Sequence, residues 1–169
     1  NNKKIPNIPI INIDQTKILP ISEKKVHQGA ILKVSLLEQP NDIHAIRGTE
    51  KPKLVIILDK VSDPQNVGAI IRSGLFFNCN AIINTVNGGS SENGSLVKAA
   101  SGAFEHIHYI QVTNIAQTIE KLKKNGYFIV GLDEHSKNRL SSVKKGNSDI
   151  AVVFGAEGKG IRRLTKEHC

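Results

Sequence analysis

The stretch from residue 53 to residue 77 constrains the fold more than any other part of the chain. It opens with the apolar run K-L-V-I-I-L, typical of a buried strand, and continues D-K-V-S-D-P-Q-N-V-G-A-I-I-R-S-G-L-F-F. Asp63 can cap a helix and Pro64 presets its first position, so we expect a strand, a sharp corner and a helix to about residue 77. Asn66 and Arg72 stand on this corner, where an amide and a guanidinium can bind an anionic group.

Short apolar runs and capped helical segments alternate along the rest of the chain. We expect further strands at 81–84, 106–112, 127–132 and 150–154, and helices at about 91–103, 115–125 and from 161 onward. Such alternation is typical of a mostly parallel sheet flanked by helices, which predicts an α/β fold. Residues 1–25 carry three prolines and indicate an edge strand with a linker, and residues 31–37 resemble another strand.

Composition limits the class of protein. The 169 residues suffice for one ordinary domain, and the net charge of +8 favours a polyanionic partner, although charge alone fits simple solubility equally well. The two cysteines form neither a disulfide framework nor a zinc spacing, and no apolar run is long enough to cross a membrane. We therefore predict a cytoplasmic protein without a metal site and without membrane contact.

A second candidate site follows the last predicted strand, where residues 155–160 read G-A-E-G-K-G. Open α/β sheets bind ligands at the carboxyl ends of their strands, and glycines let backbone amides come close to a ligand. The spacing matches neither the phosphate-binding loop nor the dinucleotide fingerprint. Alone, such a turn is more often a tight connection than a ligand loop.

Together, the two segments carry a resemblance. D-P-Q-N-V-G-A-I-I-R-S at 63–73 and F-G-A-E-G-K-G-I at 154–161 resemble the first two signature motifs of the SpoU/TrmH family of RNA 2′-O-methyltransferases in the SPOUT superfamily, and K-A-A-S-G-A at 98–103 is also similar to that family. The resemblance implies a homodimeric SPOUT-type domain with a trefoil knot. It further implies methyl transfer from S-adenosylmethionine to a ribose 2′-hydroxyl in structured RNA, ribosomal RNA first and transfer RNA second. A catalytically silent RNA-binding module is the alternative.

The resemblance also assigns residues to three roles. It implies catalytic roles for Asn66, Arg72 and Glu157; cofactor binding by Leu132, Gly155, Ala156, Glu157, Gly158 and Gly160; and RNA binding by Arg72, Lys98, Ser101, Lys159, Arg162 and Arg163.

Two physical arguments refine these roles. Arginine stays protonated at neutral pH, so we expect Arg72 to grip a phosphate and stabilise a developing alkoxide rather than to act as a base. Asn66 and Arg72 are six residues apart and so about 120° apart around a regular helix, which indicates either an irregular first turn or different tasks. Glu157 either orients Arg72 or accepts from the amides of its own loop.

The resemblance covers residues 26–169 as the catalytic domain, with residues 1–25 as a linker or the last part of an N-terminal RNA-binding domain. The third motif of the family, an Asn-x-Ser segment that opens a helix and completes the cofactor pocket and the knot, does not follow the second motif in the residues up to Cys169. We therefore expect the catalytic domain in this chain to be C-terminally incomplete and inactive alone.

Overall fold

The computed structural model describes residues 9–14, 30–32, 35, 38–39, 43, 46, 53–144 and 146–169. The chain forms two compact units, Asn1–Leu36 and Leu37–Cys169. In the first unit the described residues have no helix or strand, and Ile10 and Ile11 are exposed. Most of residues 1–25 and of the strand expected at 31–37 lies outside the described residues, and the domain boundary at residue 26 stays a prediction.

The second unit contains a five-stranded sheet in the order β3-β2-β1-β5-β4. All four pairings are parallel, which confirms the predicted α/β class. The expected knot stays a prediction. The strands are β1 (Leu54–Asp59), β2 (Ala81–Thr85), β3 (His108–Val112), β4 (Tyr127–Gly131) and β5 (Asp149–Gly155).

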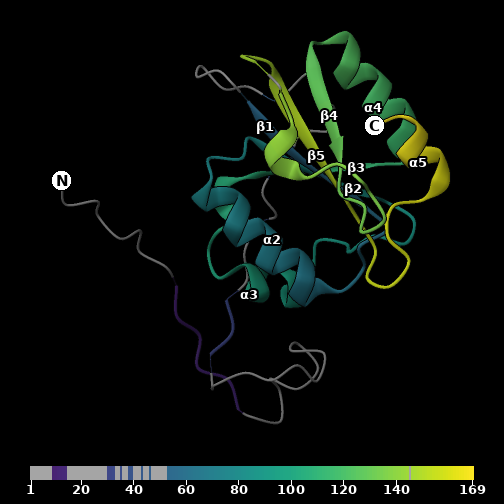
Figure 1. Ribbon diagram of the computed structural model, residues 1–169. Helices are drawn as coiled ribbons and strands as arrows, with labels where there is room; N and C mark the ends of the chain where they lie inside the picture. The colour runs from purple at the N-terminus through teal and green to yellow at the C-terminus, as the bar shows by residue number, and fades with distance from the viewer. Residues whose placement is uncertain are drawn as a thin grey trace. The chain divides into compact units, whose positions relative to one another are not determined.

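Helices cover both faces of this sheet (Figure 1). One face carries α2 (Pro64–Phe76), α3 (Gly94–Ala100) and the short 3₁₀ helix η2 (Phe104–His106), and the other carries α4 (Ile115–Lys124) and α5 (Arg163–Glu167). A second 3₁₀ helix, η3 (Leu140–Ser142), lies in the connection between β4 and β5.

The residues of β1 alternate between two hydrophobic cores. Val55 and Ile57 pack with Ile115, Ile119 and Leu122 of α4 on one face. The neighbouring residues of the strand, Ile56 and Leu58, pack on the other face with side chains of α2 and α3. Because successive side chains of a strand point to opposite faces, a continuous apolar run is what a strand buried on both sides requires.

Local capping decides where most of the elements begin. The Asp63 carboxylate accepts from the Gln65 amide 3.0 Å away, and Asn93 and Asn114 cap α3 and α4 in the same way. The helix expected at 91–103 is therefore shorter, since Asn93 precedes its first turn and Ser101 ends it with φ 51°.

Two further boundaries differ from expectation. The strand expected from residue 106 begins at His108, because residues 104–106 form η2. The helix expected from residue 161 begins at Arg163, since Arg162 is held in an extended conformation by contacts described below.

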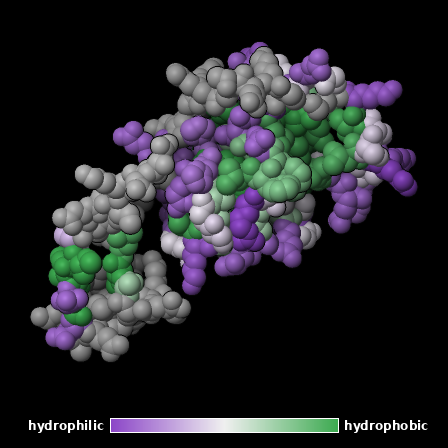
Figure 2. Space-filling view, turned by 90° about the vertical axis from the view of Figure 1, so that its left-hand side faces the viewer, coloured by the Kyte–Doolittle hydropathy of each residue, from purple (hydrophilic) through white to green (hydrophobic). Residues whose placement is uncertain are grey.

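An apolar groove of about 370 Å³ lies between α2 and strands β1 and β5. Ile70 and Phe77 line it from the helix side, and Val152 and Phe154 line it from β5. Figure 2 shows hydrophobic surface gathered on this side of the second unit. Phe76, next to the groove residue Phe77, is 81% exposed.

Candidate active site

The carboxyl ends of β1 and β5 meet where the direction of chain progression reverses. From β1 the chain moves outward through β2 to β3, whereas β4 and β5 lie on the other side of β1. Asp59 at the end of β1 pairs with Gly155 at the end of β5. Open α/β sheets bind ligands outside the strand ends at such a switch point. Both sequence motifs leave the sheet here.

The two motifs are joined by a hydrogen bond between exposed side chains. Asn66 on the first turn of α2 donates through Nδ2 to Oε2 of Glu157 over 3.2 Å. These residues lie 91 positions apart in the chain. The sequence left two partners open for Glu157, Arg72 or the amides of its own loop, whereas the hydrogen bond seen in the structure comes from a third group, the Asn66 amide.

The glycine-rich segment forms a closed loop. The Ala156 amide donates to the Gly160 carbonyl over 3.2 Å, and the Gly160 amide donates back over 2.8 Å. A side chain at Gly155 would place its Cβ 2.0 Å from the Gly160 carbonyl carbon, and Gly158 and Gly160 adopt φ of 74° and 63°. Glycine is therefore required at these positions, and the loop turns backbone rather than side chains toward the switch point.

Arg72 projects from α2 toward α3 and donates to the Ala99 carbonyl. The two helices approach closely because residue 68 is glycine: a Cβ there would lie 2.5 Å from Cβ of Ala99. Arg72 itself is exposed. The guanidinium is thus held at one end by a backbone carbonyl and remains accessible to an anionic ligand.

The residues expected to contact RNA have different surroundings. Lys98, Ser101 and Lys159 are exposed, the first two at the end of α3 near Arg72 and the third in the glycine loop. Arg163 pairs with Glu167 at 2.6 Å on α5. The Arg162 guanidinium, in contrast, is bound to the Asp59 carboxylate.

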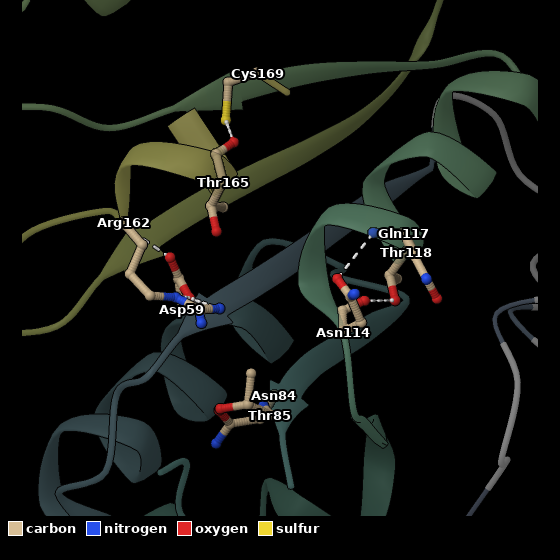
Figure 3. A network of polar contacts seen from close by, with 9 residues as sticks. All are labelled: Asp59, Asn84, Thr85, Asn114, Gln117, Thr118, Arg162, Thr165 and Cys169. Carbon is tan, nitrogen blue, oxygen red and sulfur yellow. Dashed lines mark hydrogen bonds and ion pairs between the residues drawn. The ribbon is translucent and has the colours of Figure 1, made fainter. Parts of the chain in front are cut away.

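Asp59 is the site residue that sequence reasoning missed. Its side chain is fully buried, and it accepts from the backbone amide, Nε and Nη2 of Arg162 at 3.0, 2.7 and 2.6 Å. Figure 3 shows the Arg162 side chain turned onto Asp59 at the end of β1. The available signal was an acidic residue that ends a buried strand at the start of the first motif.

A cavity of about 510 Å³ lies along β4 and the connection that follows it. Leu132, Leu140 and Val143 give it apolar walls, and Asp133 and Asn138 add polar atoms. The Leu132 amide donates to the Val153 carbonyl over 3.0 Å, which fixes this wall to β5. A cavity of this size and mixed lining can hold a flat ligand with apolar faces and polar edges.

Asp133 is also part of an ion pair that joins this wall to α5. Lys166 contacts its carboxylate. Hydrogen bonding from Lys166, followed by that from the His135 amide, lowers the pKa of Asp133. Asp133 therefore favours the ionised form.

The described residues offer neither a metal-binding cluster nor a membrane-spanning helix. No group of three or more His, Cys, Asp or Glu side chains in that part of the chain could hold a metal ion. Within the same residues, no helix has the length and apolar character that a membrane crossing requires.

The fold and the site define an open parallel α/β protein in which two motif loops meet at the switch point of the sheet, the place where such sheets bind ligands. The family model described as the SpoU rRNA Methylase family matches residues 53–169. The chain belongs to this family.

Curated relatives agree with the match. The 23S rRNA (guanosine-2′-O-)-methyltransferase RlmB of Coxiella burnetii is 35% identical over 169 residues, which cover 98% of this chain and 67% of the relative. RlmB of Escherichia coli is 37% identical over 150 residues, covering 88% and 61%. This chain thus spans about two thirds of the length of these relatives.

Solved structures share the fold. The AdoMet-bound rRNA methyltransferase of Sinorhizobium meliloti gives a TM-score of 0.71 at 18% identity, covering 91% of this chain and 57% of that one. The SpoU methyltransferase AviRb of Streptomyces viridochromogenes, in complex with AdoMet, gives 0.68 at 19% identity, covering 77% and 50%.

Proposed function

We propose that this chain carries the catalytic site of an S-adenosylmethionine-dependent RNA ribose 2′-O-methyltransferase. The observation that carries the proposal is the hydrogen bond between Asn66 and Glu157, because it joins the two motifs at the switch point of the sheet. Ribosomal RNA is the first choice of substrate, supported by the names of the relatives, and transfer RNA is the second.

The cofactor fits the residues around β4 and β5. Leu132 and the apolar cavity beside it suit an adenine ring, and the backbone of Gly155, Ala156, Gly158 and Gly160 suits a polar ligand that side chains would exclude. When bound, S-adenosylmethionine supplies a methyl group that its sulfonium activates. The protein then has to place the acceptor hydroxyl and exclude competing geometries.

Arg72 acts on the acceptor side of the site. It is exposed and permanently charged, so it can hold a phosphate next to the target ribose and stabilise the oxygen as its proton leaves. Asn66 and Glu157 order the surface between the two loops, with the Asn66 amide held by the carboxylate.

The RNA approaches over residues at the end of α3 and around the second motif. Lys98 and Ser101 extend the surface of Arg72 along α3, and Lys159, Arg162 and Arg163 extend it along the second motif. The net charge of +8 adds sequence-independent attraction to a polyanion.

We also propose a cytoplasmic homodimer. The family resemblance supports this assembly, and an apolar groove beside an exposed Phe76 is the kind of surface that subunits cover. Sedimentation of the full-length protein at several concentrations tests the dimer; a monomer at every concentration rejects it.

Methyl transfer tests the function directly. Full-length protein is incubated with labelled S-adenosylmethionine and with separated ribosomal and transfer RNA, and the label is checked for resistance to alkali. We expect Arg72→Ala to reduce the rate by about 10²- to 10³-fold, the range seen when one group that stabilises a developing oxyanion is removed.

The matched control is Lys124→Ala, which removes an exposed cation at the end of α4 and keeps the rate. If one class of RNA is labelled and only Arg72→Ala abolishes labelling, the proposal holds. If neither RNA is labelled while the protein binds RNA tightly, the chain is a silent RNA-binding module.

A further inference from the structure

Asp59 holds both ends of the glycine-rich loop. Its backbone pairs with Gly155, where the loop leaves β5, and its side chain binds Arg162, where the loop enters α5. Both carboxylate oxygens are used, Oδ1 by the guanidinium and Oδ2 by the Arg162 amide. One residue of β1 therefore fixes the start and the end of the segment that carries Glu157.

The burial of Asp59 makes this contact obligatory. Its side chain has no exposed surface, whereas that of Arg162 is 46% exposed. A buried carboxylate without a partner is strongly unfavourable, so the folded protein keeps Arg162 on Asp59. The guanidinium fork fixes orientation as well as distance, which a lysine ammonium does not do.

The loop between these anchors has few other ties among the described residues. The Ala156–Gly160 pair closes it on itself, Asn66 binds Glu157, and Ile161, next to Arg162, packs partly buried against the hydrophobic core. Its glycines give it little stiffness of its own. The position of the loop relative to β1 and α2 thus depends on the contact between Asp59 and Arg162.

We propose that Asp59 and Arg162 are positioning residues, which hold the glycine-rich loop so that Glu157 reaches Asn66 and the loop backbone faces the cofactor. The proposal rests on the proposed function for its cofactor and on the geometry alone for its effect on the loop. In this proposal Arg162 positions the glycine-rich loop already in the absence of RNA.

Amide hydrogen exchange of the full-length protein without cofactor tests the effect on the loop. Arg162→Gln removes the fork but keeps the backbone bond to Asp59, and Arg162→Lys keeps a charge on the carboxylate. We expect exchange at Ala156 and Gly160 to accelerate by about tenfold or more in Arg162→Gln and by less in Arg162→Lys, while amides of β5 keep their rates. Asp59→Asn serves as a third variant if it folds.

The matched control is Asp149→Asn. Asp149 is also a buried carboxylate in this sheet, but it lies at the opposite end of β5 and accepts from the Lys53 amide over 2.9 Å. We expect this variant to lose stability without faster exchange at Ala156 and Gly160. Titration calorimetry with S-adenosylmethionine should show affinity reduced by about ten- to a hundredfold in Arg162→Gln, as when an outer partner of a binding group is lost, and unchanged in Asp149→Asn.

The outcomes separate the two proposals. Unchanged loop exchange in Arg162→Gln, or equal loop exchange in Arg162→Gln and Asp149→Asn, overturns the positioning role. If the loop loosens as expected but even the unaltered protein neither binds the cofactor nor transfers methyl groups, the positioning role stands and the proposed function fails.

Discussion

At the scale of the residue, Tyr109 is the centre of a buried polar network at the end of β2. Its hydroxyl donates to the Ser90 carbonyl over 2.6 Å and accepts from Asn84 over 2.7 Å. Burial raises the pKa of Tyr109 to about 12. The network holds the turn after β2, next to the loop that begins the first motif.

This pKa predicts a loss of stability in alkali. An ordinary tyrosine loses its proton near pH 10.0, so the unfolded chain ionises there while folded Tyr109 stays neutral up to about pH 12. The contribution of neutral Tyr109 to the folding stability is therefore fully present below pH 10 and is lost between pH 10 and pH 12. The chain has two tyrosines, and burial raises the pKa of Tyr127 to about 12 as well, so phenolate absorbance should appear late for both.

Two variants check the assignment. Tyr109→Phe should reduce the alkaline loss of stability, measured by urea unfolding at each pH, and should lower stability at neutral pH by about 1–3 kcal/mol because Asn84 and the Ser90 carbonyl lose their partner. Tyr127→Phe keeps that network and serves as the control. Phenolate signal at the ordinary pH in folded protein contradicts the prediction.

At the scale of the element, the approach of α2 and α3 decides where Arg72 points. Gly68 lies against Ala99, whose carbonyl accepts from Arg72. The absence of a side chain at Gly68 therefore sets both the distance between the two helices and the position of the Arg72 guanidinium.

Gly68→Ala should separate these helices. The new Cβ would lie 2.5 Å from Cβ of Ala99 and 2.7 Å from its carbonyl carbon, so backbone has to move. We expect a loss of about 1–3 kcal/mol in urea unfolding, as for other overpacked sites, together with slower methyl transfer because Arg72 loses its carbonyl. Gly94→Ala, with nothing within 4 Å of the new Cβ, should stay within about 0.5 kcal/mol and keep activity. Equal behaviour of the two variants argues against the prediction.

Elements were predictable because their signals are local. Apolar runs, Asp63 and Asn114 indicate strands and helix starts within a few residues. Contacts between motifs have no such signal. Nothing in the spacing indicates that Glu157 selects Asn66, or that Arg162 turns onto Asp59 rather than toward solvent, because partners 91 and 103 positions apart are chosen by the sheet register.

At the scale of the whole molecule, the strand order places the proposed RNA surface at one edge of the sheet. The glycine loop and the start of α2 lie at the carboxyl edge, whereas α4 ends where β4 begins, at the amino edge. We therefore expect cations at the carboxyl edge to contribute more to RNA binding than cations at the amino edge.

Salt dependence of RNA binding tests this asymmetry. Lys159→Ala should weaken binding about equally for different RNA sequences and lower the slope of log affinity against log salt by about one. Lys124→Ala, at the amino edge, should leave the slope unchanged. A similar reduction in both variants would mean that RNA is not confined to the carboxyl edge.

The interior position of β5 in the sheet also bears on synthesis and folding. β5 is the last strand of the described sheet to emerge from the ribosome, yet it pairs with β1 on one side and β4 on the other. Until it arrives, β1 presents an open edge to other chains, and parallel pairing over long sequence separations is slow. We therefore expect an aggregation-prone stage before β5 pairs, and the two motifs meet only once β5 has joined β1.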